Sequence, residues 1–155
     1  MITEQEIDRG MATLKIIWLA MLVFLVGYAF AGRMIAPGMT STMSREAFGM
    51  LRTALYALGF AALIASRFVK RMILAGKGHA IGQTQTRPPS VLQRYTSAVI
   101  ASLAMSESVG MYGLVLFLLG KDETDLYLLL GISALAMVYH RPKREELASL
   151  YQERS

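Results

Sequence analysis

The sequence predicts an all-α membrane protein with four transmembrane helices arranged as two hairpins. Of its 155 residues, 54% are hydrophobic and only 17% are charged. The apolar residues gather in four long stretches that short polar segments separate. A soluble domain of this length would need far more polar surface to stay in solution. We therefore expect a single transmembrane domain over residues 1–155, surrounded mainly by lipid.

The first span is expected at about residues 15–33, where the run IIWLAMLVFLVGYAFAG carries no charge. A hydrocarbon slab of about 30 Å needs about 20 helical residues, and this stretch comes close. The triplet Ala-Phe-Ala at 29–31 resembles a signal-peptidase site, so cleavage is an alternative. An uncleaved span is favoured, because three acidic side chains before it offset two basic ones.

The other three spans are expected at about residues 50–72, 95–120 and 125–140. Ser44 is a suitable N-cap for the helix that carries the second span. The third span contains one ionisable side chain, Glu107, and a polar turn at 121–125 leads into the fourth. The second and fourth apolar runs are short, so their charged flanks must extend outward or the bilayer must thin locally.

The C-terminal tail, residues 141–155, is expected to form a short helix after Pro142, a residue suited to a first helical turn. Leu147, Leu150 and Tyr151 would then share one side. We interpret this side as resting on the inner leaflet. A docking site for a cytoplasmic partner is the alternative.

The distribution of basic residues predicts the orientation. The two tails and the segments around the middle loop hold 12 of the 16 Lys and Arg residues: Arg9, Lys15, Arg67, Lys70, Arg71, Lys77, Arg87, Arg94, Arg141, Lys143, Arg144 and Arg154. Because cytoplasmic segments are enriched in Lys and Arg, we expect both termini in the cytoplasm and the chain in the inner (cell) membrane.

Glu107 lies 13 residues after Arg94 and 14 before Lys121, so it is about 20 Å from either charged end of a continuous helix. A charged carboxylate at that depth costs at least about 2.5–3.5 kcal/mol, so a neutral acid facing other helices is expected. The hydroxyl groups of Ser106, Ser108 and Tyr112 are the candidate partners. Together they form a hypothetical site for a proton or an ion.

Small residues on the same helix predict close helix packing. Ser102, Ser106 and Gly110 recur every four residues, and Gly113 follows. Such a ridge lets another backbone approach closely. The second span offers a smooth alanine stripe, Ala54, Ala57, Ala61 and Ala65, and is the expected partner.

The stretch from Ser106 to Leu119, SESVGMYGLVLFLL, resembles the ion-carrying helix of the rotary ATPase proteolipids. In that family a mid-membrane Glu precedes a Tyr-Gly-Leu step, matched here by Glu107 and by residues 112–114. The resemblance implies a carboxyl group that binds and releases a proton or a sodium ion at a ring–stator interface. As a whole, the chain resembles the small, uncharacterised four-span membrane proteins of bacteria.

Other chemistry has little support in the sequence. It contains no cysteine, no phosphate-binding loop and no zinc-type His-Glu spacing, so we expect no catalytic residues, metal or cofactor. His79 and His140 are interpreted as ordinary loop and membrane-edge residues. Nucleic acid is not an expected partner, since the net charge of +5 follows membrane topology.

Two functions remain open. The favoured one is a non-enzymatic accessory or assembly subunit, with other membrane subunits or further copies of the chain as partners. The alternative is a transport component that binds a proton or an ion through Glu107.

Overall fold

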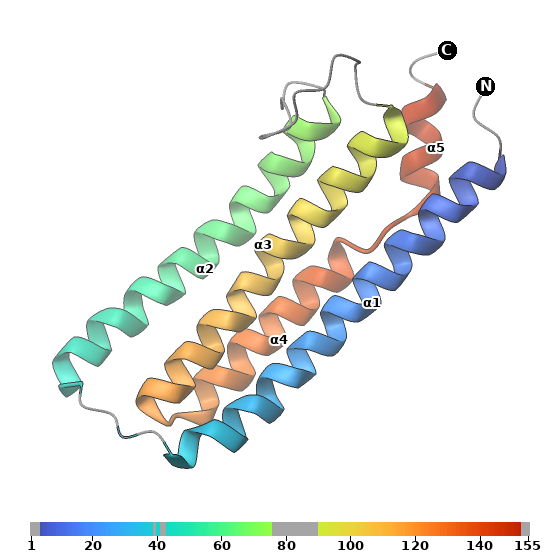
Figure 1. Ribbon diagram of the computed structural model, residues 1–155. Helices are drawn as coiled ribbons and strands as arrows, with labels where there is room; N and C mark the ends of the chain where they lie inside the picture. Colours follow the sequence, from blue (N-terminus) through green and yellow to red (C-terminus); the bar gives the residue numbers. More distant parts are fainter. Residues whose placement is uncertain (1–3, 39, 41–42, 76–89, 153–155) are drawn as a thin grey trace, which may run out of the picture.

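The computed structural model describes residues 4–38, 40, 43–75 and 90–152, and every regular element in these ranges is helical. This confirms the all-α prediction. The elements are α1 (Glu4–Ile35), the short 3-10 helix η1 (Ala36–Gly38), α2 (Arg45–Leu74), α3 (Val91–Gly120), α4 (Glu123–Tyr139) and α5 (Arg144–Gln152). Helices α1 to α4 lie side by side in alternating directions along the chain, and α5 lies at one end (Figure 1). Most of the predicted middle loop, with His79, lies outside the described residues.

Three of the helices are long and apolar enough to cross a membrane: Ile7–Gly38, Arg45–Leu74 and Val91–Gly120. They extend past the predicted spans because their polar ends continue the helical hydrogen bonding. Ser44 caps α2 as predicted, since its side chain accepts a hydrogen bond from the Ala47 N–H at 3.3 Å. Helix α4 has 17 residues and is the shortest of the four that lie side by side.

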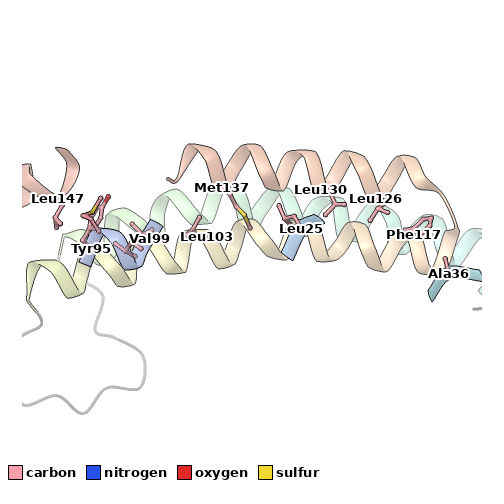
Figure 2. Packing of buried hydrophobic residues seen from close by; sticks show 12 residues of the cluster. Leu25, Ala36, Tyr95, Val99, Leu103, Phe117, Leu126, Leu130, Met137 and Leu147 are labelled. Carbon is pink, nitrogen blue, oxygen red and sulfur yellow. The ribbon is translucent and has the colours of Figure 1, made fainter. Parts of the chain in front are cut away.

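Helix α3 is the centre of the bundle, because α1, α2, α4 and α5 all pack against it. One apolar cluster runs along the molecule, from Leu147 and Tyr95 at one end to Phe117 and Ala36 at the other (Figure 2). Burial is correspondingly uneven. Eleven of the α3 residues are buried, whereas only Gly59 and Ser66 are buried in α2.

The turn between α3 and α4 is tighter than the predicted polar segment 121–125. It consists of Lys121, in the left-handed region with φ 58°, and Asp122, the N-cap of α4. The Asp122 carboxylate accepts the Thr124 N–H at 2.9 Å. That hydrogen bond at a helix N-terminus holds the pKa of Asp122 below its usual value. The Lys121 ammonium donates to the Ala36 carbonyl and so ties η1 to the turn.

The C-terminal helix forms as predicted, but its apolar side packs on protein and not on the inner leaflet. Leu147 is fully buried, and Leu150 and Tyr151 pack against the same core cluster. The Tyr95 ring of α3 is also fully buried, and its hydroxyl accepts a hydrogen bond from the Lys143 N–H at 2.9 Å. The leaflet interpretation is therefore wrong, because the link after α4 brings α5 over the end of α3.

Candidate functional site

Glu107 is half-buried near the middle of α3 and accepts a hydrogen bond from a tyrosine of α1. The Tyr28 hydroxyl donates to Glu107 Oε1 at 2.7 Å. Helices α1 and α3 run in the same direction (Figure 1), so Tyr28 reaches Glu107 at the level where Leu25 approaches Gly110. No second hydrogen bond and no ion pair to this carboxyl group is found in the part of the chain that the structure describes.

The predicted hydroxyl partners of Glu107 have other partners or positions. Ser106 Oγ donates to the Ser102 carbonyl at 2.9 Å, and Ser108 Oγ donates to the Met105 carbonyl at 2.8 Å. Tyr112 packs in the apolar cluster between α3 and α2. Although these three residues are close to Glu107 in the sequence, none of them donates a hydrogen bond to its carboxyl group among the described contacts. The donor, Tyr28, comes from another helix.

Tyr28 was not among the predicted site residues. Its apolar surroundings in the sequence suggested an aromatic ring near a membrane interface. One signal for its role exists: it is a hydroxyl-bearing residue within a run that otherwise has no hydrogen-bonding side chain apart from Trp18. A buried tyrosine hydroxyl usually finds a partner, but the sequence does not say which helix supplies it.

The small-residue ridge of α3 faces α4 and α1. A Cβ on Gly110 would lie 2.6 Å from Leu25 Cδ2 and 3.3 Å from Leu130 Cδ2. A Cβ on Gly113 would lie 2.9 Å from Leu129 Cβ. In addition, Ser133 Oγ donates to the Ser106 carbonyl at 2.6 Å.

The expectation that the alanine stripe of α2 covers this ridge is wrong. Ala54, Ala57 and Ala61 are exposed, and α2 approaches the other side of α3 through Gly59. A Cβ on Gly59 would be 3.6 Å from Val109, an ordinary contact distance. The reason is geometric: Leu55, Tyr56, Gly59 and Leu63 recur at helical spacing on a different face from the alanines.

A second acidic residue, Asp125 in the first turn of α4, is fully buried. Its Oδ1 accepts from the Arg52 guanidinium at 2.7 Å and from the Tyr56 hydroxyl at 2.7 Å. Its Oδ2 is buried with no hydrogen-bond partner among the residues described. The charge pair joins α2 to α4, so α2 is held at this end by an ion pair whose carboxylate is buried and whose guanidinium is partly exposed.

Asp125 was not predicted as a site residue, because residues 121–125 were expected to form a polar turn. An available signal was the spacing of Arg52 and Tyr56, which lie four residues apart and therefore on one face of a helix. That face could be recognised as polar, but its partner 69 residues away from Tyr56 could not.

Comparisons with protein-family models, with curated proteins and with solved structures find no match. The chemistry of the site therefore has to be judged from its own geometry.

Two further observations concern the residues that could bind a metal ion or a cofactor. Within the described ranges, no three His, Cys, Asp or Glu side chains come together in a way that could bind a metal ion. His140 is buried, and its Nδ1 lies 2.9 Å from the Ala136 carbonyl of its own helix, as suits an ordinary capping residue. The arrangement around Glu107 offers one carboxyl group and one phenol, which can share or pass a proton.

Proposed function

We propose that this chain is a four-span protein of the inner membrane, with both termini in the cytoplasm, and that it acts as a non-enzymatic accessory or assembly subunit of a membrane complex. Helix α4 would be the fourth span. Its 17 residues extend about 25 Å, slightly less than a hydrocarbon slab of about 30 Å, so local thinning is needed. The excess of Lys and Arg at the end that carries both termini supports the orientation.

The observation that carries the subunit role is an uncovered stripe beside Glu107. Four exposed side chains recur along α3 at helical spacing: Ile100, Ala104, Met111 and Val115. We call them the α3 stripe. Met111 is 49% exposed and lies one turn from Glu107, which is itself only half-buried. Lipid against a half-covered carboxyl group in mid-membrane is unfavourable, whereas a second protein helix would exclude it.

The partner we propose is a transmembrane helix of another subunit that presents a hydrogen-bond acceptor to the neutral acid expected at Glu107. Tyr28 already donates to Oε1, so the proton of the neutral acid is on the second oxygen, which can donate to such an acceptor. Interhelical hydrogen bonds of this kind contribute about 0.6 kcal/mol on average, so the apolar contacts of the α3 stripe would supply the rest of the affinity.

A second candidate function is the binding of a proton or an ion at Glu107, in the manner of the proteolipids. It is favoured by the same half-buried position, because a carboxyl group with a single described donor can exchange its proton more readily than a sealed one. In that case the exposed side of Glu107 would face an access path and not a tightly packed helix.

Cross-linking from the α3 stripe tests the subunit role. The chain has no cysteine, so Ala104→Cys introduces a single thiol for a short photoactivated cross-linker in native membranes. We expect one defined adduct with another membrane protein. The matched control is Phe60→Cys, on α2 and 68% exposed, which should give lipid adducts only. A missing adduct at 104 would contradict the proposal, and an adduct with a second copy would make the partner the chain itself.

Carbodiimide labelling distinguishes the two functions. A covered Glu107 should stay unreactive in native membranes and react once detergent separates the complex. An ion-exchanging Glu107 should react in intact membranes and be protected at high pH. Glu107→Gln gives the background signal from the other carboxyl groups.

A further inference from the structure

A cavity of about 450 Å³ lies at the end of the bundle that carries α5. It is an open pocket, lined by the ends of α2 and α4, by the link after α4 and by the start of α5. The lining side chains that matter here are Lys70, Tyr139, Arg141, Lys143 and the Glu145–Glu146 pair. The site is separate from Glu107 and from Asp125, and neither proposed function uses it.

Contacts within the lining leave two basic groups available to a ligand. Lys70 Nζ lies 2.6 Å from one oxygen of Glu146 and 2.9 Å from the other, so these two charges neutralise each other. Arg141 and Lys143 are exposed and form no ion pair with a carboxylate of the described residues. With Glu145 counted, the lining still carries a net positive charge.

The backbone of this site is held in place by the core. The buried Tyr95 hydroxyl accepts from the Lys143 N–H at 2.9 Å and lies 3.0 Å from the Lys143 carbonyl. The same hydroxyl lies 3.3 Å from Glu146 Oε2. The position of Lys143 is therefore fixed by α3, and ordering the cavity wall costs little when a ligand binds.

The lining residue Tyr139 has the character of a residue at a membrane interface. The Arg67 guanidinium lies 4.9 Å from the centre of the Tyr139 ring, and this ring is 62% exposed. Amphipathic aromatic rings favour the headgroup level of a bilayer. One turn further into the membrane, Leu135 is 73% exposed and offers an apolar surface to an acyl chain.

We propose that this cavity binds the phosphate group of an anionic phospholipid from the cytoplasmic leaflet, and the assignment of the leaflet rests on the orientation proposed above. Arg141 can bind a phosphate with two parallel hydrogen bonds, and Lys143 adds a point charge. Basic pockets between transmembrane helices on the cytoplasmic side recognise such headgroups. The exposed Leu135, one turn before Tyr139, favours a phosphate that belongs to a lipid over one that belongs to a soluble ester.

The test measures lipid binding to the full chain. Wild type in phosphatidylcholine nanodiscs is titrated with short-chain phosphatidylglycerol, and binding is followed by native mass spectrometry. The test variant combines Arg141→Gln with Lys143→Gln. The control combines Arg71→Gln with Arg94→Gln, which removes the same charge at the same end but outside the cavity. We expect the test variant to bind about 25-fold more weakly than wild type, since each of the two removed basic groups contributes about fivefold near a membrane surface. The control should bind more tightly than the test variant, because its two removed charges lie outside the cavity.

Two further arms make the outcome decisive. The charge-conserving swap of Arg141→Lys with Lys143→Arg should retain most of the binding, which shows that the test variant lost charge and not its fold. Equal binding of phosphatidylglycerol to the test and control variants would overturn the proposal. So would equal binding of inorganic phosphate and lipid, which would assign the cavity to a soluble anion. Nanodiscs offer the same lipid on both sides, so failure here leaves the proposed orientation and subunit role untouched.

Discussion

Asp125 and Glu107 are acidic side chains on adjacent helices, and the protein surrounds them differently. Asp125 is fully buried at the start of α4 and is paired with Arg52, while the Tyr56 hydroxyl donates to the same oxygen. Glu107 is half-buried in the middle of α3 and receives one hydrogen bond, from Tyr28. In both places a tyrosine hydroxyl donates at 2.7 Å, so the difference is the cation.

The comparison separates a carboxyl group that is paired with a cation from one that is not. When a buried carboxylate has a guanidinium at 2.7 Å, loss of either partner leaves an uncompensated group. Among the described residues, Glu107 has a phenol beside it and no cation. We therefore assign Asp125 to the fold, where it holds α2, whereas Glu107 belongs to the contact proposed above for the α3 stripe.

The largest effect should come from Asp125→Asn. The amide keeps the size of the side chain but removes the charge that pairs with Arg52. We expect a loss of about 2–3 kcal/mol in unfolding free energy, near the lower end of the range for a broken buried ion pair, because Arg52 is partly exposed. The measurement is reversible unfolding in mixed micelles.

Glu107→Gln is the matched control for that substitution. Its amide oxygen still accepts the Tyr28 hydroxyl, so folding should change by less than about 0.5 kcal/mol. If Glu107→Gln is as damaging as Asp125→Asn, or fails to insert, then Glu107 is ionised and paired, and our distinction between the two acids is wrong.

A smaller effect is expected where α1 closes on α3 next to Glu107. In Gly110→Ala the new methyl group would meet Leu25 Cδ2 at 2.6 Å, so α1 or the leucine must shift, at a cost of about 1–2 kcal/mol. The shift should also loosen the Tyr28–Glu107 hydrogen bond. Thermal stability in detergent and carbodiimide reactivity together measure both consequences.

Gly131→Ala provides the control, because nothing lies within 4 Å of the position of its Cβ. Alanine favours helix over glycine by up to about 1 kcal/mol, so this variant should be unchanged or slightly more stable. Equal destabilisation of both variants would show that α1 does not pack on Gly110.

The smallest loss of stability among the test variants is expected for Tyr28→Phe, and its comparison with Tyr56→Phe distinguishes the roles of these two tyrosines. Tyr28→Phe removes the described donor to Glu107, for about 0.6 kcal/mol and at most about 1.7 kcal/mol. The reactivity of Glu107 toward carbodiimide in detergent should rise. Tyr56→Phe leaves Asp125 with its arginine, so its carboxylate should stay unreactive. A rise at Asp125 and none at Glu107 would reverse the assignment.

Much of the secondary structure, and the position of Glu107 in the middle of the third predicted span, were predictable from composition and spacing. The isolated Glu107, the Ser44 cap and the helix after Pro142 each depend on residues close together in the chain. The burial of Gly110 and Gly113 also agrees with the predicted ridge. The prediction that α2 covers this ridge is wrong, because residues of α1 and α4 lie against it. The spacing of small residues in α2 does not by itself say which side of the helix is covered. In the structure the side of α2 that carries Leu55 and Tyr56 packs on α3, and the alanine side is exposed.

By itself, the sequence determined that the chain is helical and that long apolar segments run through it, because transfer to lipid depends on the composition of each segment. It predicted four spans, whereas three helices of the structure are long and apolar enough to cross a membrane. Only the tertiary structure decided the partners. Tyr28 meets Glu107 across 79 positions and Tyr56 meets Asp125 across 69. Such contacts depend on how whole helices rotate and pack, and the side-chain period of one helix carries no information about its neighbour.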